Sequence, residues 1–170
     1  MAKLTTKQYP WQRMMHYIAA SAIGATVFSK LLHYVDPKLM RLSQDRLSIP
    51  KVVAGLPVVI LTSTGAKSGQ ARTMPVMGVP DGDNIVLIAS NWGQSRNPAW
   101  YYNLQAHPVA ELKFNGHTGT YIAREVADPD EYRRLWQKAT EIYMGFDKYQ
   151  QRAGRKIPII CMMPQVEKPS

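Results

Sequence analysis

The sequence has little of what metal centres and disulfide-stabilised folds need. It contains a single cysteine, Cys161, so no disulfide can form within the chain. Cys161 lies in an apolar run, and we expect it to be a small buried side chain rather than a nucleophile. Metal coordination is not predicted either, because the four histidines have no closely paired spacing; they are His16, His33, His107 and His117.

Several motifs of nucleotide-binding and hydrolytic enzymes are also absent. There is no Walker-type Gly-Lys-Ser/Thr loop, no GxGxxG and no GxSxG, so the usual phosphate loops and a serine hydrolase elbow are not predicted. The charge-free stretch 17–29 is shorter than the roughly 20 apolar residues that span a bilayer. With no evident secretory signal, we expect a cytoplasmic protein.

Acidic residues are scarce, and the resulting positive charge is uneven. The net charge is +9, and residues 1–51 hold eight Lys or Arg but two acids, which places +6 of the +9 there. Such a surface suits nucleic acid, an anionic membrane or an anionic cofactor. Nucleic acid is the least favoured, because the basic residues are not interleaved with aromatic ones in a known module.

The N-terminal third is expected to form a helical arm. Pro10 suits the first turn of a helix that runs to about Val35, and Trp11, Met15 and Ile18 recur on one face. The helix either packs on the rest of the protein or lies peripherally on an anionic surface such as the inner face of the cell membrane. We therefore divide the chain into an arm, residues 1–51, and a domain, residues 52–170.

From residue 52 the pattern changes to short strands separated by turns. Strands are expected at 58–62, 72–79, 85–90, 109–114, 118–126 and 157–162, with helices after Pro98 and after Asp128. Because strand and crossover helix do not alternate, a doubly wound sheet is not expected. The order predicts an α+β fold, a mostly antiparallel barrel of about six strands with surrounding helices.

Three segments carry possible chemistry. Thr62–Arg72 joins the first two strands, and its glycines, hydroxyls and basic side chains would suit a phosphate or carboxylate, although a solvated hairpin would look similar. Ala89–Tyr101 leads into a helix, for which we expect Asn97 as N-cap and Pro98 as first residue. Tyr143–Tyr149 places three aromatic residues at intervals of three, which could line a pocket or simply pack.

In this order and spacing the segments resemble the deazaflavin-dependent nitroreductase family. The resemblance covers about residues 53–164. It rests on Ile60-Leu61-Thr62-Ser63-Thr64-Gly65, Lys67-Ser68-Gly69-Gln70, Arg72, Ser90, Arg96-Asn97-Pro98-Ala99-Trp100-Tyr101-Tyr102-Asn103-Leu104 and Ile157-Pro158.

The resemblance implies a split β-barrel that binds an 8-hydroxy-5-deazaflavin, coenzyme F-420, and passes its hydride to a small acceptor. Lys67, Ser68 and Arg72 would hold the anionic tail. Tyr143 and Tyr149 would line the acceptor pocket as catalytic candidates, together with Ser90. The other implied coenzyme-binding residues are Pro75, Val76, Ile88, Ser90, Asn91, Asn97, Pro98 and Trp100.

The acceptor is left open among a quinone, an enone and a nitro compound. Met77, Asn91 and Phe146 replace a tyrosine, a lysine and a tyrosine of a nitroimidazole-reducing relative, which argues against that drug activity. Two other functions fit the sequence: an FMN-binding barrel reductase, and a non-enzymatic carrier of lipid or cofactor on a membrane surface.

Overall fold

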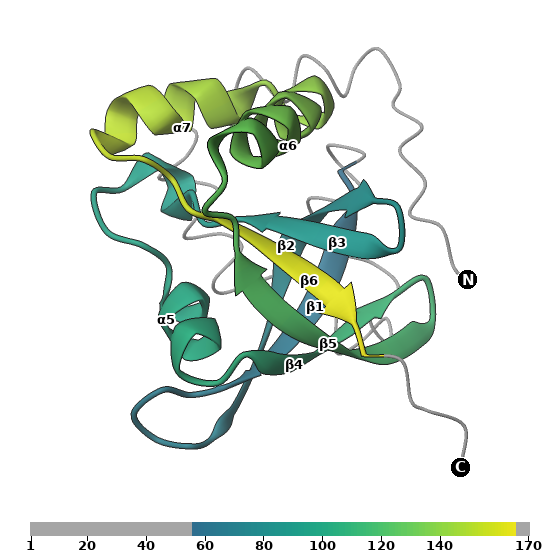
Figure 1. Ribbon diagram of the computed structural model, residues 1–170. Helices are drawn as coiled ribbons and strands as arrows, with labels where there is room; N and C mark the ends of the chain where they lie inside the picture. The colour runs from purple at the N-terminus through teal and green to yellow at the C-terminus, as the bar shows by residue number, and fades with distance from the viewer. Residues whose placement is uncertain (1–55, 166–170) are drawn as a thin grey trace.

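The computed structural model describes residues 56–165, which contain six strands, one short 3-10 helix and three α-helices (Figure 1). The predicted arm, residues 1–51, lies outside the described residues. The strands are β1 (Val58–Thr64), β2 (Ala71–Asp81), β3 (Asn84–Ile88), β4 (Val109–Phe114), β5 (His117–Glu125) and β6 (Ile159–Pro164). The helices are η1 (Asn91–Gly93), α5 (Ala99–Ala106), α6 (Pro129–Ile142) and α7 (Gly145–Ala153).

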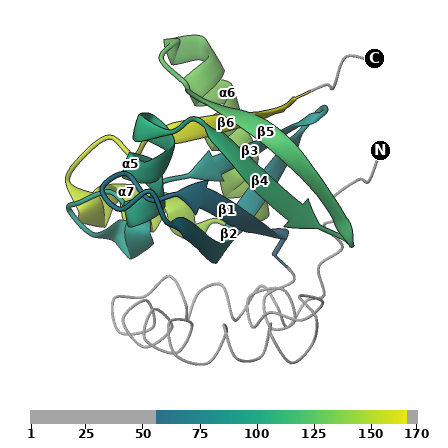
Figure 2. The same ribbon diagram turned by 90° about the horizontal axis from the view of Figure 1, so that it is seen from below.

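The strands form a closed barrel in the order β1-β2-β3-β6-β5-β4. Every neighbouring pair is antiparallel, and β1 closes the ring by pairing Ile60 with Lys113 and Thr62 with Glu111 on β4. Figure 2 shows β1 between β2 and β4. The predicted six-stranded antiparallel barrel with surrounding helices is confirmed.

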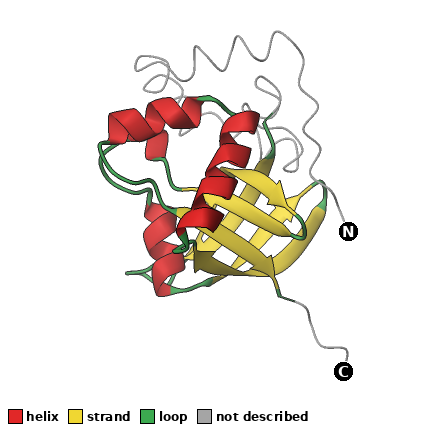
Figure 3. Ribbon diagram, turned by 45° about the horizontal axis from the view of Figure 1, so that its top comes forward, coloured by secondary structure: helices red, strands yellow, loops and turns green. Residues whose placement is uncertain are grey.

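Side chains alternate between two cores because successive residues of a strand point to opposite faces. On β3, Ile85 and Leu87 belong to the core inside the barrel, whereas Val86 and Ile88 belong to a second core outside it. Helices α6 and α7 cover that second core on the outside of the strands (Figure 3). The α7 side of the barrel is therefore where aromatic residues meet the outward face of β3.

The turns follow from local sequence. The β4–β5 turn places Asn115 at φ 50° and Gly116 at φ 79°, the left-handed pair that an Asn-Gly hairpin uses. The helix expected after Asp128 begins at Pro129, and the Asp128 carboxylate caps it by accepting from the backbone N–H of Asp130 and Glu131. The predicted cap of α5 is wrong, because the helix begins at Ala99 with Pro98 in the cap position and no side-chain capping bond.

Helix α6 is tied to the end of β2 by a shared carboxylate. Asp81 accepts from Arg134 through both oxygens, at 2.8 and 2.9 Å, and from the Lys138 ammonium at 2.9 Å. The hydrogen bond from Arg134 is the largest cause, and together with the hydrogen bond and charge of Lys138 it outweighs desolvation and lowers the pKa of Asp81 to about 2. Within residues 56–165, no helix has the length and apolar character needed to cross a membrane.

Candidate active site

The loop between β1 and β2 is closed by its own backbone. Gly65 N–H donates to the carbonyl of Gln70, and Gly69 N–H donates to the carbonyl of Gly65, both at 2.8 Å. A side chain at Gly65 would stand 2.7 Å from Ser68 Oγ, and Gly69 has a left-handed φ of 65°. The two glycines therefore permit the tight loop that the sequence predicted as an anion cradle.

Helix α5 fixes this loop through one amide side chain. Asn103 Oδ1 accepts from Ala66 N–H at 3.0 Å, and Asn103 Nδ2 donates to Ser63 Oγ at 3.2 Å. Ser63 is buried, so the clamp joins the barrel interior to the exposed tip. The sequence placed Asn103 in the family motif without a role, because partners 37 and 40 residues away are not visible in a local pattern.

The cations of the loop are available to a ligand. Lys67 and Arg72 are both exposed, and within residues 56–165 neither forms an ion pair. Ser68 is also exposed, although its hydroxyl accepts from Gln70 N–H at 3.3 Å. Two cations and a hydroxyl on a rigid, solvent-facing loop fit the phosphate and carboxylates of an anionic tail.

The predicted ring-contacting residues fall on different faces of the barrel. Val76 pairs with Val59 and packs with the inner core, so Pro75, its neighbour, points to the outer face. Ile88 belongs to the outer core with the aromatic residues of α7, whereas Trp100 is buried in the inner core. Met77 and Ile88 share the outer core, and Pro75 lies on the same face of β2 as Met77 by strand alternation, whereas the Val76 side chain points inward.

Ser90 and Asn91 lie on a segment with unusual backbone conformation. Asn91 and Trp92 have φ values of 45° and 58°, which residues with a side chain rarely adopt. Asn91 Nδ2 donates to the carbonyl of Arg96 at 3.0 Å and to Gln94 Oε1 at 3.3 Å. The amide of Asn91 thus holds the loop closed on itself beside the buried Ser90.

Two arginines from the end of α7 hold the same segment from outside. Arg152 donates to the carbonyl of Trp92 at 3.2 Å, and Arg155 donates to those of Ala89 and Arg96, both at 3.2 Å. Asn97 Oδ1 is buried and has no hydrogen-bond partner among the described residues. The sequence predicted no role for either arginine.

The predicted catalytic tyrosines contact each other. The hydroxyls of Tyr143 and Tyr149 lie 2.9 Å apart, and their rings form a cluster with Phe146 whose centroids are separated by 5.4 to 6.3 Å. Trp92 packs edge-on to Tyr149 at 6.2 Å, which joins the cluster to η1. Tyr143 directly follows α6, whereas Phe146 and Tyr149 lie on α7, a helix that the sequence did not predict.

Burial controls the protonation of both phenols. Tyr143 is 4% exposed and Tyr149 3% exposed, and this desolvation is the main cause that raises the pKa of each. The hydrogen bond between them opposes that rise in Tyr143 and adds to it in Tyr149. Both phenols remain protonated at neutral pH, so the pair can donate a hydrogen bond to an anionic oxygen.

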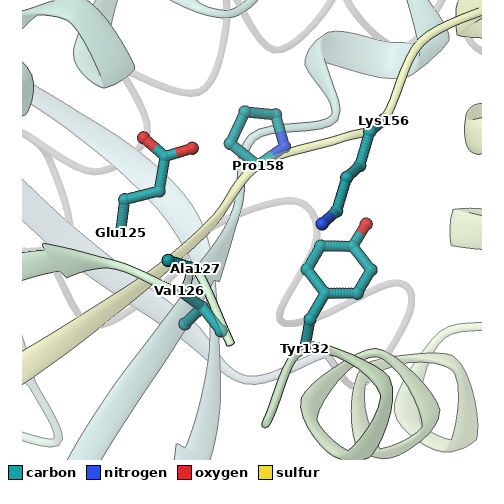
Figure 4. A pocket seen from close by; sticks show the side chains of 6 residues that line it. All are labelled: Glu125, Val126, Ala127, Tyr132, Lys156 and Pro158. Carbon is teal, nitrogen blue, oxygen red and sulfur yellow. The ribbon is translucent and has the colours of Figure 1, made fainter. Parts of the chain in front are cut away.

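A cavity of about 490 Å³ lies elsewhere on the barrel (Figure 4). The Lys156 ammonium stands over the Tyr132 ring, 4.2 Å from its centroid, and Glu125 accepts from Tyr101 at 2.9 Å and Gln105 at 2.8 Å. None of the predicted site residues lines it. The lining residues are Glu125, Val126, Ala127, Tyr132, Lys156 and Pro158.

Residues 56–165 contain no group of three or more His, Cys, Asp or Glu side chains that could hold a metal ion. Cys161 is buried, as expected. Apart from the tyrosine pair, the polar side chains described around the two loops are amides, serine hydroxyls and cations. The arrangement favours chemistry in which a bound coenzyme supplies the reactive group.

Comparisons with known proteins agree on one family. A family model described as F420H(2)-dependent quinone reductase matches residues 40–164. An F420H(2)-dependent quinone reductase of Mycobacterium tuberculosis is 38% identical over 109 residues, which cover 62% of this chain and 72% of that protein.

Solved structures match as well. An F420-H2 dependent reductase (FDR-A) is 33% identical with a TM-score of 0.58, over 62% of this chain and 93% of that one. A domain-swapped dimer is 29% identical with a TM-score of 0.60, over 76% of this chain and 97% of that one.

Proposed function

The chain belongs to the F420H(2)-dependent quinone reductase family and is an F-420-dependent reductase, and we propose that its acceptor is a quinone. The match to the family model over residues 40–164 carries this conclusion. The FMN alternative is set aside because the family model, the mycobacterial quinone reductase and the reductase FDR-A are all named for the deazaflavin coenzyme. A non-enzymatic carrier is set aside for the same reason.

The β1–β2 loop would hold the coenzyme by its anionic tail. Lys67 and Arg72 supply charge, and the loop is already rigid because Asn103 and the backbone bonds of Gly65 and Gly69 fix it. A rigid site loses less entropy on binding than a flexible one. Pro75 and Ile88 would face the ring from the outer side of the barrel, beside Ser90 and Asn91.

When bound, the reduced coenzyme supplies a hydride. Adding a hydride to a quinone gives a hydroquinone monoanion, and one proton completes the hydroquinone. Tyr143 and Tyr149 would donate a hydrogen bond to the oxygen on which that charge develops, and the buried aromatic cluster would exclude water around it. The protein thus needs to position and to stabilise charge, without a nucleophile of its own.

The acceptor preference is supported by two observations. The matching family and its mycobacterial relative are named for quinones. Met77, Asn91 and Phe146 lack the hydroxyls and ammonium that the resemblance associates with nitroimidazole reduction. An enone, which also forms an oxyanion on hydride addition, is the closest competitor on chemical grounds.

The test is an acceptor screen with the full chain and reduced coenzyme. We expect turnover with menadione, a soluble naphthoquinone, to exceed turnover with 2-cyclohexen-1-one or a nitroimidazole. Return of the oxidised coenzyme's absorbance measures the rate. A higher kcat/KM for either of the other acceptors would overturn the quinone assignment while leaving the reductase intact.

The tail-binding role is tested by Arg72→Ala. A charge-assisted hydrogen bond contributes about 1.5–3 kcal/mol, so coenzyme affinity should fall about tenfold or more. Fluorescence titration with oxidised coenzyme at low salt gives the affinity. Arg133→Ala is the matched control, since Arg133 is exposed and pairs with Asp130 on α6. Equal affinities in the two variants would remove Arg72 from the coenzyme site.

A further inference from the structure

Arg155 reaches back from the end of α7 to the loop that carries Ser90 and Asn91. Helix α7 is followed by Gly154, whose φ of 62° reverses the chain. The Arg155 guanidinium then donates from Nη2 to the carbonyls of Ala89 and Arg96, which lie at the two ends of the Ala89–Arg96 segment. This side chain therefore bridges the two ends, in addition to the bond from Asn91 to the carbonyl of Arg96 within the segment.

Arg155 is not placed there by an acid. Within residues 56–165 it forms no ion pair, and its third acceptor is the carbonyl of Lys156, at 3.4 Å from Nη1. Its Nε–H is buried without a hydrogen-bond partner among the described residues, which is unfavourable for stability. Since Arg155 bonds main-chain carbonyls and leaves its Nε–H unpaired, its position is better explained by the loop conformation that it stabilises than by ion pairing.

The segment needs an external constraint. Asn91 and Trp92 both occupy left-handed backbone conformations, each unfavourable by about 1–3 kcal/mol, and such conformations persist only where the surroundings fix them. Both bonds come from Nη2, whose two N–H groups have fixed directions in the guanidinium plane, whereas a lysine ammonium rotates on a flexible stem. Arg155 has the geometry that this constraint requires.

We propose that Arg155 is a positioning residue for the coenzyme. It holds Ala89 and Arg96 at a fixed separation, and thereby keeps Ser90 and Asn91 in the wall that faces the deazaflavin ring. The inference rests on the proposed function, because it assigns that wall to the coenzyme. In this role Arg155 would act through the loop rather than through a contact of its own with the coenzyme.

The test compares Arg155→Lys and Arg155→Ala with Arg133→Ala, which removes the same charge from an exposed site on α6. We expect roughly tenfold weaker binding of oxidised coenzyme in Arg155→Ala, a smaller loss in Arg155→Lys, and no change in the control. With reduced coenzyme and menadione, the loss should appear mainly as a higher KM for the coenzyme in Arg155→Ala, and Arg133→Ala should keep the wild-type KM.

Chemical rescue separates positioning from general stability. Guanidinium ions added at non-denaturing concentration to Arg155→Ala should restore coenzyme affinity, whereas methylammonium, a cation without the planar fork, should not. Amide hydrogen exchange should be faster at residues 90–96 in the variant and return towards wild type on rescue. If affinity is unchanged in both Arg155 variants, or if guanidinium does not restore it, the inference is wrong.

Failure of the proposed function looks different in the same titration. Wild-type protein that binds no coenzyme would remove the coenzyme site altogether. If the wild type and both Arg155 variants bind the coenzyme equally well, only the role of Arg155 is overturned. Thermal unfolding of each variant shows whether a loss of affinity results from a loss of fold. If Arg155→Ala is unfolded, the coenzyme affinity of Arg155→Lys tests the role of Arg155.

Discussion

Gly145 shows how a single residue shapes the acceptor side of the site. A side chain at position 145 would collide with the Tyr143 ring and its hydroxyl. The start of α7 therefore leaves room for the phenol to lie against its backbone and meet Tyr149. Glycine at this position permits the hydroxyl pair, and the sequence alone does not show it because Gly145 there resembles an ordinary turn residue.

Removing the hydroxyl of Tyr143 tests its chemical role. Tyr143→Phe keeps the ring packing and should lower turnover with menadione by about 10- to 1,000-fold if the hydroxyl stabilises the developing oxyanion. Coenzyme affinity should change by less than about twofold, since the hydroxyl is not part of the tail-binding loop. Steady-state kinetics and fluorescence titration measure the two quantities.

Tyr102→Phe provides the comparison, because Tyr102 is an exposed tyrosine on α5 outside the aromatic cluster. It should leave both quantities unchanged. Intact turnover with lost coenzyme binding in Tyr143→Phe would move Tyr143 to the coenzyme site.

Site residues that are recognised by their sequence neighbours could be predicted, whereas residues that act on distant parts of the chain could not. Lys67 and Arg72 stand out in sequence because glycines bracket a basic loop. Asn103 and Arg155 act on backbone atoms 37 to 66 residues away, so no spacing rule identifies them. The opposite orientations of Pro75 and Val76 follow from strand alternation, but only once the register is known.

At the scale of elements, alternating hydrophobicity and turn residues predicted all six strands. The exceptions are at helix ends. Pro98 occupies the cap of α5, which left the expected Asn97 cap without a capping bond. Helix α7 was not predicted, and its residues were interpreted only as an aromatic series that could line a pocket or pack. Tertiary packing against β3 keeps α7 as a helix of its own.

The attachment of α6 to β2 predicts a specific loss of stability in acid. The pKa of Asp81 is lowered from 3.8 to about 2, so its contribution is fully present above pH 4 and is lost as the pH falls through 2. Asp81→Asn should reduce the free energy of unfolding by about 1–2 kcal/mol at pH 7, discounted because Arg134 and Lys138 are partly exposed. Urea denaturation at a series of pH values measures it.

The difference between wild type and Asp81→Asn should shrink as the pH approaches 2. Asp130→Asn is the control, because that carboxylate is 84% exposed and pairs only with Arg133 at the surface. A pH-independent difference for Asp81→Asn would mean that packing, rather than charge, holds α6 to β2.

At the scale of the whole molecule, the positive charge is concentrated in the first third of the sequence. Residues 1–51 carry +6 of the net +9. Quinones are apolar and concentrate in membranes, so a surface-bound enzyme would meet its proposed acceptor there. We propose that this arm draws the protein to anionic membranes.

Each basic residue near an anionic surface contributes about 1 kcal/mol. Co-sedimentation with vesicles of phosphatidylcholine and phosphatidylserine should therefore fall when residues 1–51 are deleted and when salt is raised. The full chain with neutral phosphatidylcholine vesicles is the control. Equal partition to the two vesicle types would contradict an electrostatic role for the arm.

The strand order also constrains how the chain is made. β6 is the last strand along the described chain, yet it lies between β3 and β5. β1 likewise pairs on one side with β4, which is made later than β2 and β3. While β6 is still in the ribosome, the emerging chain exposes the unpaired edges of β3 and β5. Such edges are templates for aggregation. Pairing of residues 159–164 with β3 and β5 therefore ends this exposure, and a chain that stops before residue 159 would keep an open sheet.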